Sequence, residues 1–169
     1  GRMAQNPFTF YRGSALNMAS DLATTPNTGI HVQCCGDAHL MNFGGFATPE
    51  RNIIFSINDL DETLPAPWEW DVKRLAASFV LACRDNGLNE SVAGEAVVSC
   101  VRSYREHMAA FSDLKTLELW YYCLESEMLV SAITDPQIRK RVIRRLTKER
   151  GRSAAEDIFP KLTQASGES

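Results

Sequence analysis

The sequence lacks the features that mark membrane-spanning, secreted and zinc-binding proteins. No apolar run approaches the roughly 18–20 residues that a helix needs to cross a bilayer, and GRMAQNPFTFYRG at the start has no apolar stretch typical of a signal peptide. Five cysteines, an odd number, form no CxxC pair, so their spacing indicates neither a disulfide framework nor a zinc finger. We therefore expect a soluble cytoplasmic protein with reduced and mostly buried thiols.

The chain also lacks an excess of positive charge. Its 169 residues hold 18 Lys and Arg against 21 Asp and Glu, a net charge of -3. We therefore do not expect nucleic acid or an acidic membrane as its main partner. The balance is uneven, because residues 1–71 contain eight acids and three bases whereas residues 72–169 contain thirteen acids and fifteen bases. The excess of acidic residues in the first part therefore calls for a structural or functional explanation.

The first part of the chain combines turn residues with short β-rich runs. A helix is expected over residues 13–23, a strand at IHVQCC, and a hairpin formed by NFGGFA and NIIFSI. The length and the 44% hydrophobic content fit one core, so we expect a single domain over residues 1–169.

After Pro67 the periodicity becomes helical. The run DVKRLAASFVLACRD predicts a helix with Asp71 as its N-cap. Its apolar face would hold Val72, Leu75, Ala76, Phe79, Val80 and Cys83. Further helices are predicted over residues 90–111, 114–133, 136–149 and 153–162. The expected fold class is α+β and mostly helical, with a short β-hairpin packed on helices.

Residues suited to phosphoryl chemistry lie between Gly36 and Asp71. The segment CGDAHLMNFG places Asp37 and Asn42 five positions apart at the end of a strand, and the following hairpin ends in NDLDE. A carboxylate on a fixed loop can activate a hydroxyl, and a neutral amide oxygen can ligate Mg²⁺. A second carboxylate, Asp59 or Asp61, would bind the metal that bridges phosphates. This order is typical of a protein-kinase-like active site.

Several longer motifs carry a family resemblance that covers nearly the whole chain. The runs PFTFYRGSALNMASDL, CGDAHLMNFG, NDLDETLPAPWEWDVKRLAAS and SYREHM resemble the bacterial domain-of-unknown-function family 2252. That family is similar to the kinase-like superfamily of aminoglycoside phosphotransferases and choline kinases, whose catalytic loop reads His-Gly-Asp-x-His-x-x-Asn. The resemblance implies the C-terminal, catalytic-loop lobe of a kinase-like fold.

The same resemblance implies roles for particular side chains. Asp37 would be the catalytic base, Asn42 a metal ligand, and Asp59 the counterpart of the Asp in Asp-Phe-Gly, with Asp61 as a second acid nearby. Asp71 would match the Asp that opens the following helix and braces the catalytic loop. His39 and Cys35 would be site neighbours, although Cys35 stands where the kinase pattern has its first His. The implied cofactors are Mg²⁺ and ATP, and the implied partners are a nucleotide and an unknown small-molecule hydroxyl.

One half of the kinase pattern is missing from this sequence. No Gly-rich phosphate loop followed by a strand Lys is present, because GGFATPE belongs to the hairpin and Lys73 lies in a predicted helix. Similar family members are longer and carry those elements later. The chain is therefore expected to be an N-terminal fragment of a longer, permuted kinase-like protein. The rest of that fold, or a second copy of the chain, would cover its exposed apolar surface, and the fragment alone should transfer phosphate negligibly.

Other interpretations of the same residues remain open. Asp37 and Asn42 could accept hydrogen bonds from backbone amides of the loop, and His39 could form a hydrogen bond within a turn. The acidic residues around Asp59 could form a solvent-exposed turn. The chain could then be a non-catalytic binding or pseudo-enzyme module, or the acids could belong to a metal-dependent phosphoesterase. Two features have no assigned role. They are Arg12 in FYRG and the basic stretch Arg139–Arg152, whose bases form either a solvated helix face or an anion- or partner-binding face.

Overall fold

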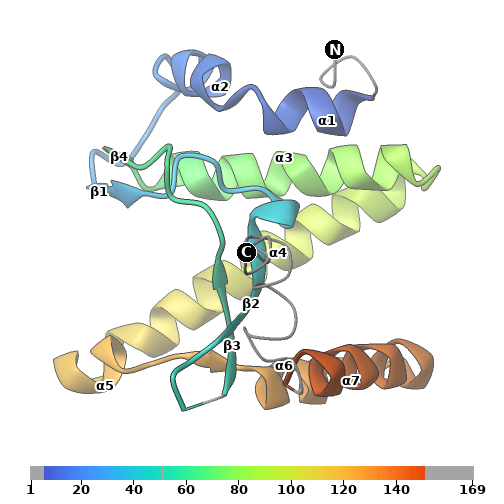
Figure 1. The fold of residues 1–169 in the computed structure, drawn as a ribbon. Coiled ribbons are helices and arrows are strands. Elements are labelled where there is room, and N and C mark those ends of the chain that lie inside the picture. The colour runs from blue at the N-terminus through green and yellow to red at the C-terminus, as the bar shows by residue number, and fades with distance from the viewer. Residues whose placement is uncertain (1–5, 51, 151–169) are drawn as a thin grey trace, which may run out of the picture. The chain divides into compact units, whose positions relative to one another are not determined.

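The computed structural model describes residues 6–50 and 52–150, and the chain divides into two compact units (Figure 1). Unit 1 contains the described residues up to Gly44 together with Ile57–Tyr122. Unit 2 contains Gly45–Ser56 and the described residues from Cys123 onward. Each unit is described by itself below. The predicted helix over residues 153–162 lies outside the described residues.

The long helix α3 (Glu69–Asp85) organises unit 1. Helices α1 (Pro7–Arg12), α2 (Ala15–Leu22) and α4 (Glu90–Ser112) all pack on it (Figure 1). Asn6 and Asn89 cap α1 and α4, because their side chains accept hydrogen bonds from Thr9 N and Val92 N. The predicted helices near residues 13–23 and 90–111 are confirmed, whereas α1 was not predicted.

A two-stranded antiparallel sheet lies at the end where α3 begins (Figure 1). Strand β1 (His31–Cys34) pairs with β4 (Leu64–Pro67), with His31 opposite Pro67 and Cys34 opposite Leu64. The strand β1 was predicted, but the sequence LPAP was not recognised as a strand. Its two prolines, Pro65 and Pro67, are tolerated because they alternate with the residues whose amides face β1, such as Trp68, which donates to the Ile30 carbonyl (3.3 Å). On an edge strand the other positions face away from the partner, so no ladder bond is lost.

Unit 2 is built on the predicted hairpin. Strand β3 (Ile53–Ile57) lies between β2 (Phe43–Ala47) and the two-residue strand β5 (Leu124–Glu125). Helix α6 (Ser126–Ala132) follows β5 directly and packs against α7 (Pro136–Arg150). The prediction of a helix from residue 136 is therefore confirmed.

The single helix predicted over residues 114–133 is wrong. The chain forms α5 (Thr116–Trp120), then β5, then α6. The amides of Tyr121 and Tyr122 bond back to the carbonyls of Leu117 and Leu119, which closes α5 in a tight turn. Extended backbone follows because Leu124 and Glu125 pair with β3. A long-range strand pairing therefore overrides the local helical periodicity.

The predicted start and apolar face of α3 also need correction. The helix begins at Glu69 with Trp68 as N-cap, so Asp71 lies in the first turn and does not cap it. Its carboxylate is instead directed to another segment of the chain, as described below. The fully buried residues of α3 are Arg74, Ser78 and Cys83, whereas the other predicted face residues are half-buried. The most buried stripe of this helix is therefore largely polar.

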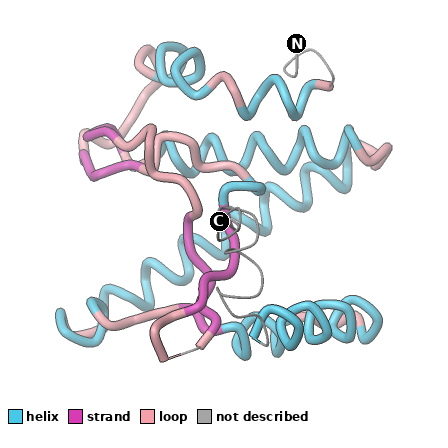
Figure 2. Tube along the Cα trace, in the orientation of Figure 1, coloured by secondary structure: helices cyan, strands magenta, loops and turns pink. Residues whose placement is uncertain are grey.

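Small side chains dominate the buried core of the described residues. The buried apolar residues are Cys34, Cys35, Ala38, Ile53, Ala66, Cys83 and Ala93. All five cysteines are free in this structure, with three buried, Cys100 intermediate and Cys123 exposed, so the prediction that most of the thiols are buried is confirmed. The α+β, mostly helical class is also confirmed (Figure 2). Within the described part of the chain, no helix combines the length and apolar character needed to cross a bilayer.

Candidate functional site

Three polar side chains of α3 hold the loop that follows β1. The Asp71 carboxylate accepts hydrogen bonds from Cys35 N (2.6 Å) and Gly36 N (3.0 Å), and Ser78 Oγ accepts one from Leu40 N (3.1 Å). Between these two, Arg74 binds Asp37. Residues 71, 74 and 78 share one helix face. Together they form a row of polar side chains about 10 Å long, which contacts the loop along its length.

A glycine is required where this loop turns. Gly36 has φ +82°, in the left-handed region that side chains disfavour. A Cβ built there would also collide with the carbonyl of Glu62. Gly36 therefore lets the loop pass close to the Glu62 backbone while its own amide reaches Asp71.

Asp37 is held by two neighbours. Arg74 donates to its Oδ1 from Nε (2.8 Å) and from Nη2, and His39 Nε2 lies 3.3 Å from Oδ2. His39 Nδ1 accepts from Met41 N (3.1 Å), which leaves the neutral ring with its proton on Nε2, facing Asp37. Burial acts to raise the pKa of Asp37, but hydrogen bonds from His39 and Arg74 and the charge of Arg74 outweigh it. The pKa of Asp37 is lowered, so this side chain is a carboxylate at neutral pH.

Tyr11 of α1 supports the buried Arg74. The Arg74 guanidinium lies 4.4 Å from the centre of the Tyr11 ring, and its Nη2 donates to the Tyr11 carbonyl (2.9 Å). The Tyr11 hydroxyl donates to the Arg74 carbonyl (2.8 Å). Burial raises the pKa of Tyr11 to about 12, although the charge of Arg74 acts to lower it. Arg74 is only 2% exposed, and its guanidinium finds partners on Asp37, on Tyr11 of α1 and on Met18 of α2, whose Sδ lies 3.6 Å from Nη1.

Asn42 joins the loop to the segment that follows β3. Its Nδ2 donates to the carbonyls of Asp37 and Asp59 (3.0 Å each), and its Oδ1 accepts from Asp59 N (2.9 Å). The side chain is buried, with 4% exposed. In this arrangement Asn42 fixes the position of Asp59 relative to Asp37.

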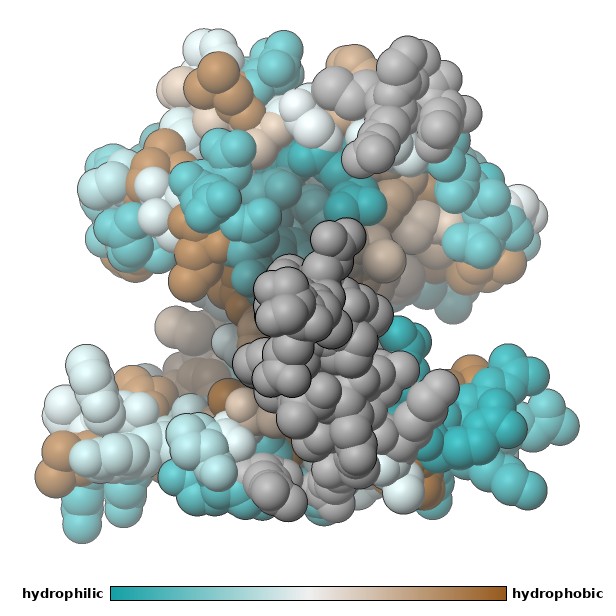
Figure 3. All heavy atoms as spheres, viewed as in Figure 1, coloured by the Kyte–Doolittle hydropathy of each residue, from teal (hydrophilic) through white to brown (hydrophobic). Residues whose placement is uncertain are grey.

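These residues surround an open cleft of about 590 Å³ in unit 1. Its lining consists of Thr9, Arg12, Gly13, Asp37, His39, Met41, Asn42, Asn58 and Asp59. Figure 3 shows hydrophilic residues gathered on this part of unit 1, beneath α1. The cleft therefore brings Asp37, Asn42 and Asp59 together. Asp61 is exposed and outside the lining, although its amide donates to Asp59 Oδ1 (3.0 Å).

Cys35 is part of this packing but carries no free thiolate. Its Sγ lies 3.9 Å from the Asp59 carbonyl and 3.8 Å from Asn42 Nδ2. Burial raises the pKa of the Cys35 thiol, and the charge of Asp71 acts in the same direction. A protonated, buried thiol is a poor nucleophile, so Cys35 helps to shape the site without reacting.

The cleft contains a small number of oxygen ligands that suit Mg²⁺. Asp59 is exposed, and among the described residues its carboxylate accepts a hydrogen bond from the amide of Asp61 at Oδ1 and from none at Oδ2. Asn42 Oδ1 has one lone pair engaged by Asp59 N. Among residues 6–50 and 52–150 no group of three or more His, Cys, Asp or Glu could hold a metal ion. Mg²⁺ commonly uses one or two carboxylates together with substrate phosphates and waters, so Asp59 fits such an ion.

Arg74, Tyr11 and Ser78 were not predicted as residues of the site. A signal was present for two of them, because Asp71, Arg74 and Ser78 are spaced three and four residues apart on an otherwise apolar helix. Polar residues at the spacing of one helix face indicate that the face meets polar backbone. No local pattern indicated Tyr11, because its partner Arg74 is 63 residues away.

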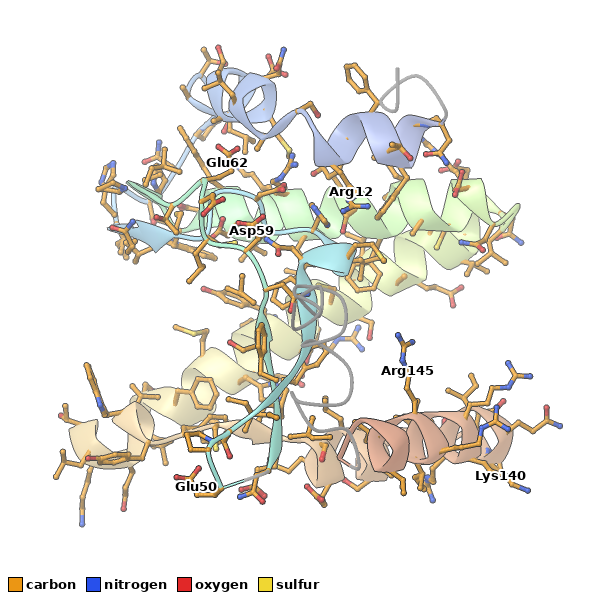
Figure 4. The ribbon with its side chains drawn as sticks, in the orientation of Figure 1. Arg12, Glu50, Asp59, Glu62, Lys140 and Arg145 are labelled. Carbon is orange, nitrogen blue, oxygen red and sulfur yellow. The ribbon has the colours of Figure 1, made fainter. Side chains whose placement is uncertain are left out.

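The basic stretch lies on α7 in unit 2 as far as Arg150, and Arg152 lies outside the described residues. Arg139 Nε donates to the Ile133 carbonyl (2.8 Å), and the side chains of Lys140 and Arg145 are exposed (Figure 4). Hydrophilic residues cover the side of α7 seen in Figure 3. The bases of this helix whose side chains the structure describes are all exposed, which fits either a solvated face or a face that binds an anion or a partner.

Comparison with known proteins identifies a family for this chain. The family described as "Uncharacterized protein conserved in bacteria (DUF2252)" matches residues 1–169. No curated protein and no solved structure matches the chain.

Proposed function

The chain belongs to the uncharacterised bacterial family DUF2252, and from the cleft in unit 1 we propose that it is a kinase-like phosphotransferase domain. The reaction would be the Mg²⁺-dependent transfer of a nucleotide γ-phosphoryl group, with ATP as the nucleotide, to a hydroxyl of a small molecule. The observation that carries the proposal is the ionised Asp37, fixed at a cleft that also contains Asp59.

Asp37 would orient the acceptor hydroxyl and take its proton. Arg74 and His39 fix the carboxylate, and its lowered pKa keeps the group ionised at neutral pH. A weakly basic carboxylate suits phosphoryl transfer, because most of the rate in this chemistry comes from positioning and charge neutralisation. Asp71, which accepts from two loop amides, would keep this loop in place.

Asp59 would hold the metal ion, with Asn42 Oδ1 as a second oxygen ligand. When bound, Mg²⁺ would neutralise the charge on the transferred phosphates. The Asn42 side chain sets the position of Asp59 through its backbone, so the metal side of the site would be fixed relative to Asp37.

A second candidate function is non-catalytic binding. The carboxylate of Asp37 already accepts two hydrogen bonds from Arg74 and faces His39 Nε2. Such an arrangement also suits a purely structural ion pair, in which case the cleft would bind a ligand without transferring a group. A metal-dependent phosphoesterase remains a weaker alternative for the same acids.

Nucleotide binding tests the proposal without requiring full activity. Isothermal titration of the chain with ATP should show binding that depends on Mg²⁺. Asp59→Asn should abolish the Mg²⁺ dependence, because it removes the exposed carboxylate of the cleft. Glu62→Gln is the matched control, because Glu62 is an exposed acid of the same segment that does not line the cleft. Equal effects of the two variants would contradict the metal site.

Nucleotide turnover separates the two candidate functions, and it is measured on a longer version of the chain, because these 169 residues alone are expected to transfer phosphate negligibly. ADP formation that is lost in Asp37→Asn, while that variant still binds Mg²⁺ and ATP, would identify Asp37 as the base. Unchanged turnover in a folded Asp37→Asn protein would overturn that assignment. Mg²⁺-dependent binding without turnover in the presence of diverse hydroxyl compounds would favour the binding module.

A further inference from the structure

Arg12 is a cation of the cleft that lacks a partner among the described residues. It lines the cleft together with Asp37 and Asp59, and its side chain is exposed. Figure 4 shows Arg12 on the side of α1 where Asp59 lies. Its guanidinium makes no hydrogen bond or ion pair with any residue in the described ranges. The five N–H donors of this group are therefore directed to solvent or to a ligand.

The backbone that carries Arg12 is fixed by the network that orients Asp37. The carbonyl of Tyr11 accepts hydrogen bonds from Ser14 N (3.1 Å), Ser14 Oγ (2.9 Å) and Arg74 Nη2 (2.9 Å). Ser14 is buried, and α1 ends in this turn. The same guanidinium of Arg74 that holds Tyr11 also holds Asp37. Arg12 therefore projects from an anchored position beside the proposed base.

The charges of the cleft leave Arg12 and Asp59 as separate binding groups. Arg74 neutralises Asp37, whereas Arg12 and Asp59 face the same cleft without forming an ion pair with each other. Two opposite charges that line one cleft without pairing suit a ligand with an anionic group, which Arg12 would bind, and an accompanying cation, which Asp59 would bind. A guanidinium presents a planar fork of donors that matches two oxygens of a phosphate group.

We propose that Arg12 binds a phosphate group of the ligand in this cleft, and the choice of phosphate as the anion rests on the phosphotransferase function proposed above. Arg12 would donate two N–H hydrogen bonds to oxygens of the phosphate in a bidentate contact, while Asp59 would hold the accompanying cation. The arrangement would place the phosphate next to Asp37, where the acceptor hydroxyl is expected.

Titration with inorganic phosphate, and separately with ATP in the presence of Mg²⁺, tests this role. Arg12→Ala should weaken the binding of both probes by about tenfold or more, because charge-assisted hydrogen bonds are lost. Arg12→Lys should retain part of the affinity, since it keeps the charge but not the fork. The matched control is Arg102→Ala, at an exposed arginine of α4 outside the cleft lining. It should leave both affinities unchanged.

A site-specific measurement accompanies the titration. Phenylglyoxal modifies accessible arginines, and phosphate should protect Arg12 but not Arg102 from modification, as read by mass spectrometry. Circular dichroism should show the Arg12→Ala variant folded, because no described partner is lost.

The outcomes distinguish this inference from the proposed function. Equal weakening by Arg12→Ala and Arg102→Ala would show general charge attraction and overturn the role of Arg12, as would an absence of phosphate binding by the unaltered chain. Phosphate binding through Arg12 without Mg²⁺-dependent nucleotide binding would support the anion site while contradicting the phosphotransferase. Turnover that depends on Asp37 but is unchanged in Arg12→Ala would reject the anion site alone.

Discussion

At the scale of single residues, the ion pair of Asp37 and Arg74 is expected to have a large effect on the free energy of unfolding. Arg74 is 2% exposed and has hydrogen-bond partners on both Asp37 and Tyr11. Burying two charges costs desolvation energy, which the pair recovers only when the hydrogen-bond geometry is nearly complete. Removal of one partner should therefore cost far more than replacement of both.

We expect Arg74→Met to destabilise the protein by about 3–5 kcal/mol, because it leaves Asp37 without its counter-charge. The double variant Arg74→Met with Asp37→Asn should recover part of that loss. Chemical denaturation of the two single variants and the double variant measures the coupling. Additive losses would show that the two side chains do not stabilise each other.

The lowered pKa of Asp37 predicts a pH dependence of stability. Because its pKa in the folded protein lies below the ordinary value, the stabilisation from this carboxylate is present above about pH 4 and is lost as the pH falls through the lowered value. Asp37→Asn should therefore be less stable than the unaltered chain at neutral pH, and the difference should shrink in acid. Urea denaturation at a series of pH values measures the difference in free energy of unfolding between the two proteins. A difference that does not change with pH would contradict the ion pair.

At the scale of elements, polar side chains of α3 position the loop of residues 35–40. Asp71, Arg74 and Ser78 each bind a different part of the loop of residues 35–40. The backbone amides of Cys35, Gly36 and Leu40 thereby find acceptors away from any sheet ladder. The prediction that Asp71 caps this helix was wrong because its carboxylate serves the amides of the loop and not those of α3.

Asp71→Asn should lower the free energy of unfolding by about 1–3 kcal/mol, because an amide NH₂ group would oppose one of the two loop donors. Ligand binding in the cleft should weaken as well, since the loop carries Asp37. Thermal melting measures the first effect, and titration with ATP and Mg²⁺ measures the second. Ser91→Ala, at an exposed serine of α4, is a control with little expected effect. Unchanged melting of Asp71→Asn would reject the bracing role.

At the scale of the whole molecule, the large apolar side chains are mostly outside the small core. Leu117, Trp120 and Tyr121 are 70%, 79% and 77% exposed, and they are consecutive or near neighbours around α5. The buried apolar residues of the described chain are mainly Cys and Ala. Such a molecule exposes apolar surface that an ordinary globular monomer would cover.

Trp120→Ser should therefore reduce the binding of the dye 8-anilinonaphthalene-1-sulfonate, which reports exposed apolar surface. It should change the free energy of unfolding by no more than about 0.5 kcal/mol, because the indole makes little buried contact. Leu16→Ser, at an 80% exposed leucine of α2, is the control and should alter dye binding less. A large loss of stability in Trp120→Ser would show that the indole is packed.

The local sequence determined the short strand of IHVQCC, the hairpin and the helices that begin near residues 69, 90 and 136. It also determined which residue types could perform chemistry, because Asp37, Asn42 and Asp59 stand at the ends of strands. These features follow from periodicity and turn residues over a few positions, which each segment contains by itself.

Only the tertiary structure decided how those residues are arranged. Extended backbone at Leu124 depends on pairing with β3, and the environment of Asp37 depends on Arg74 from α3 and, through it, on Tyr11 from α1. These partners are 37 and 63 residues apart in the sequence, beyond the reach of any local pattern. The burial of Arg74 is stable only because segments from three parts of the chain supply its hydrogen bonds and counter-charge together.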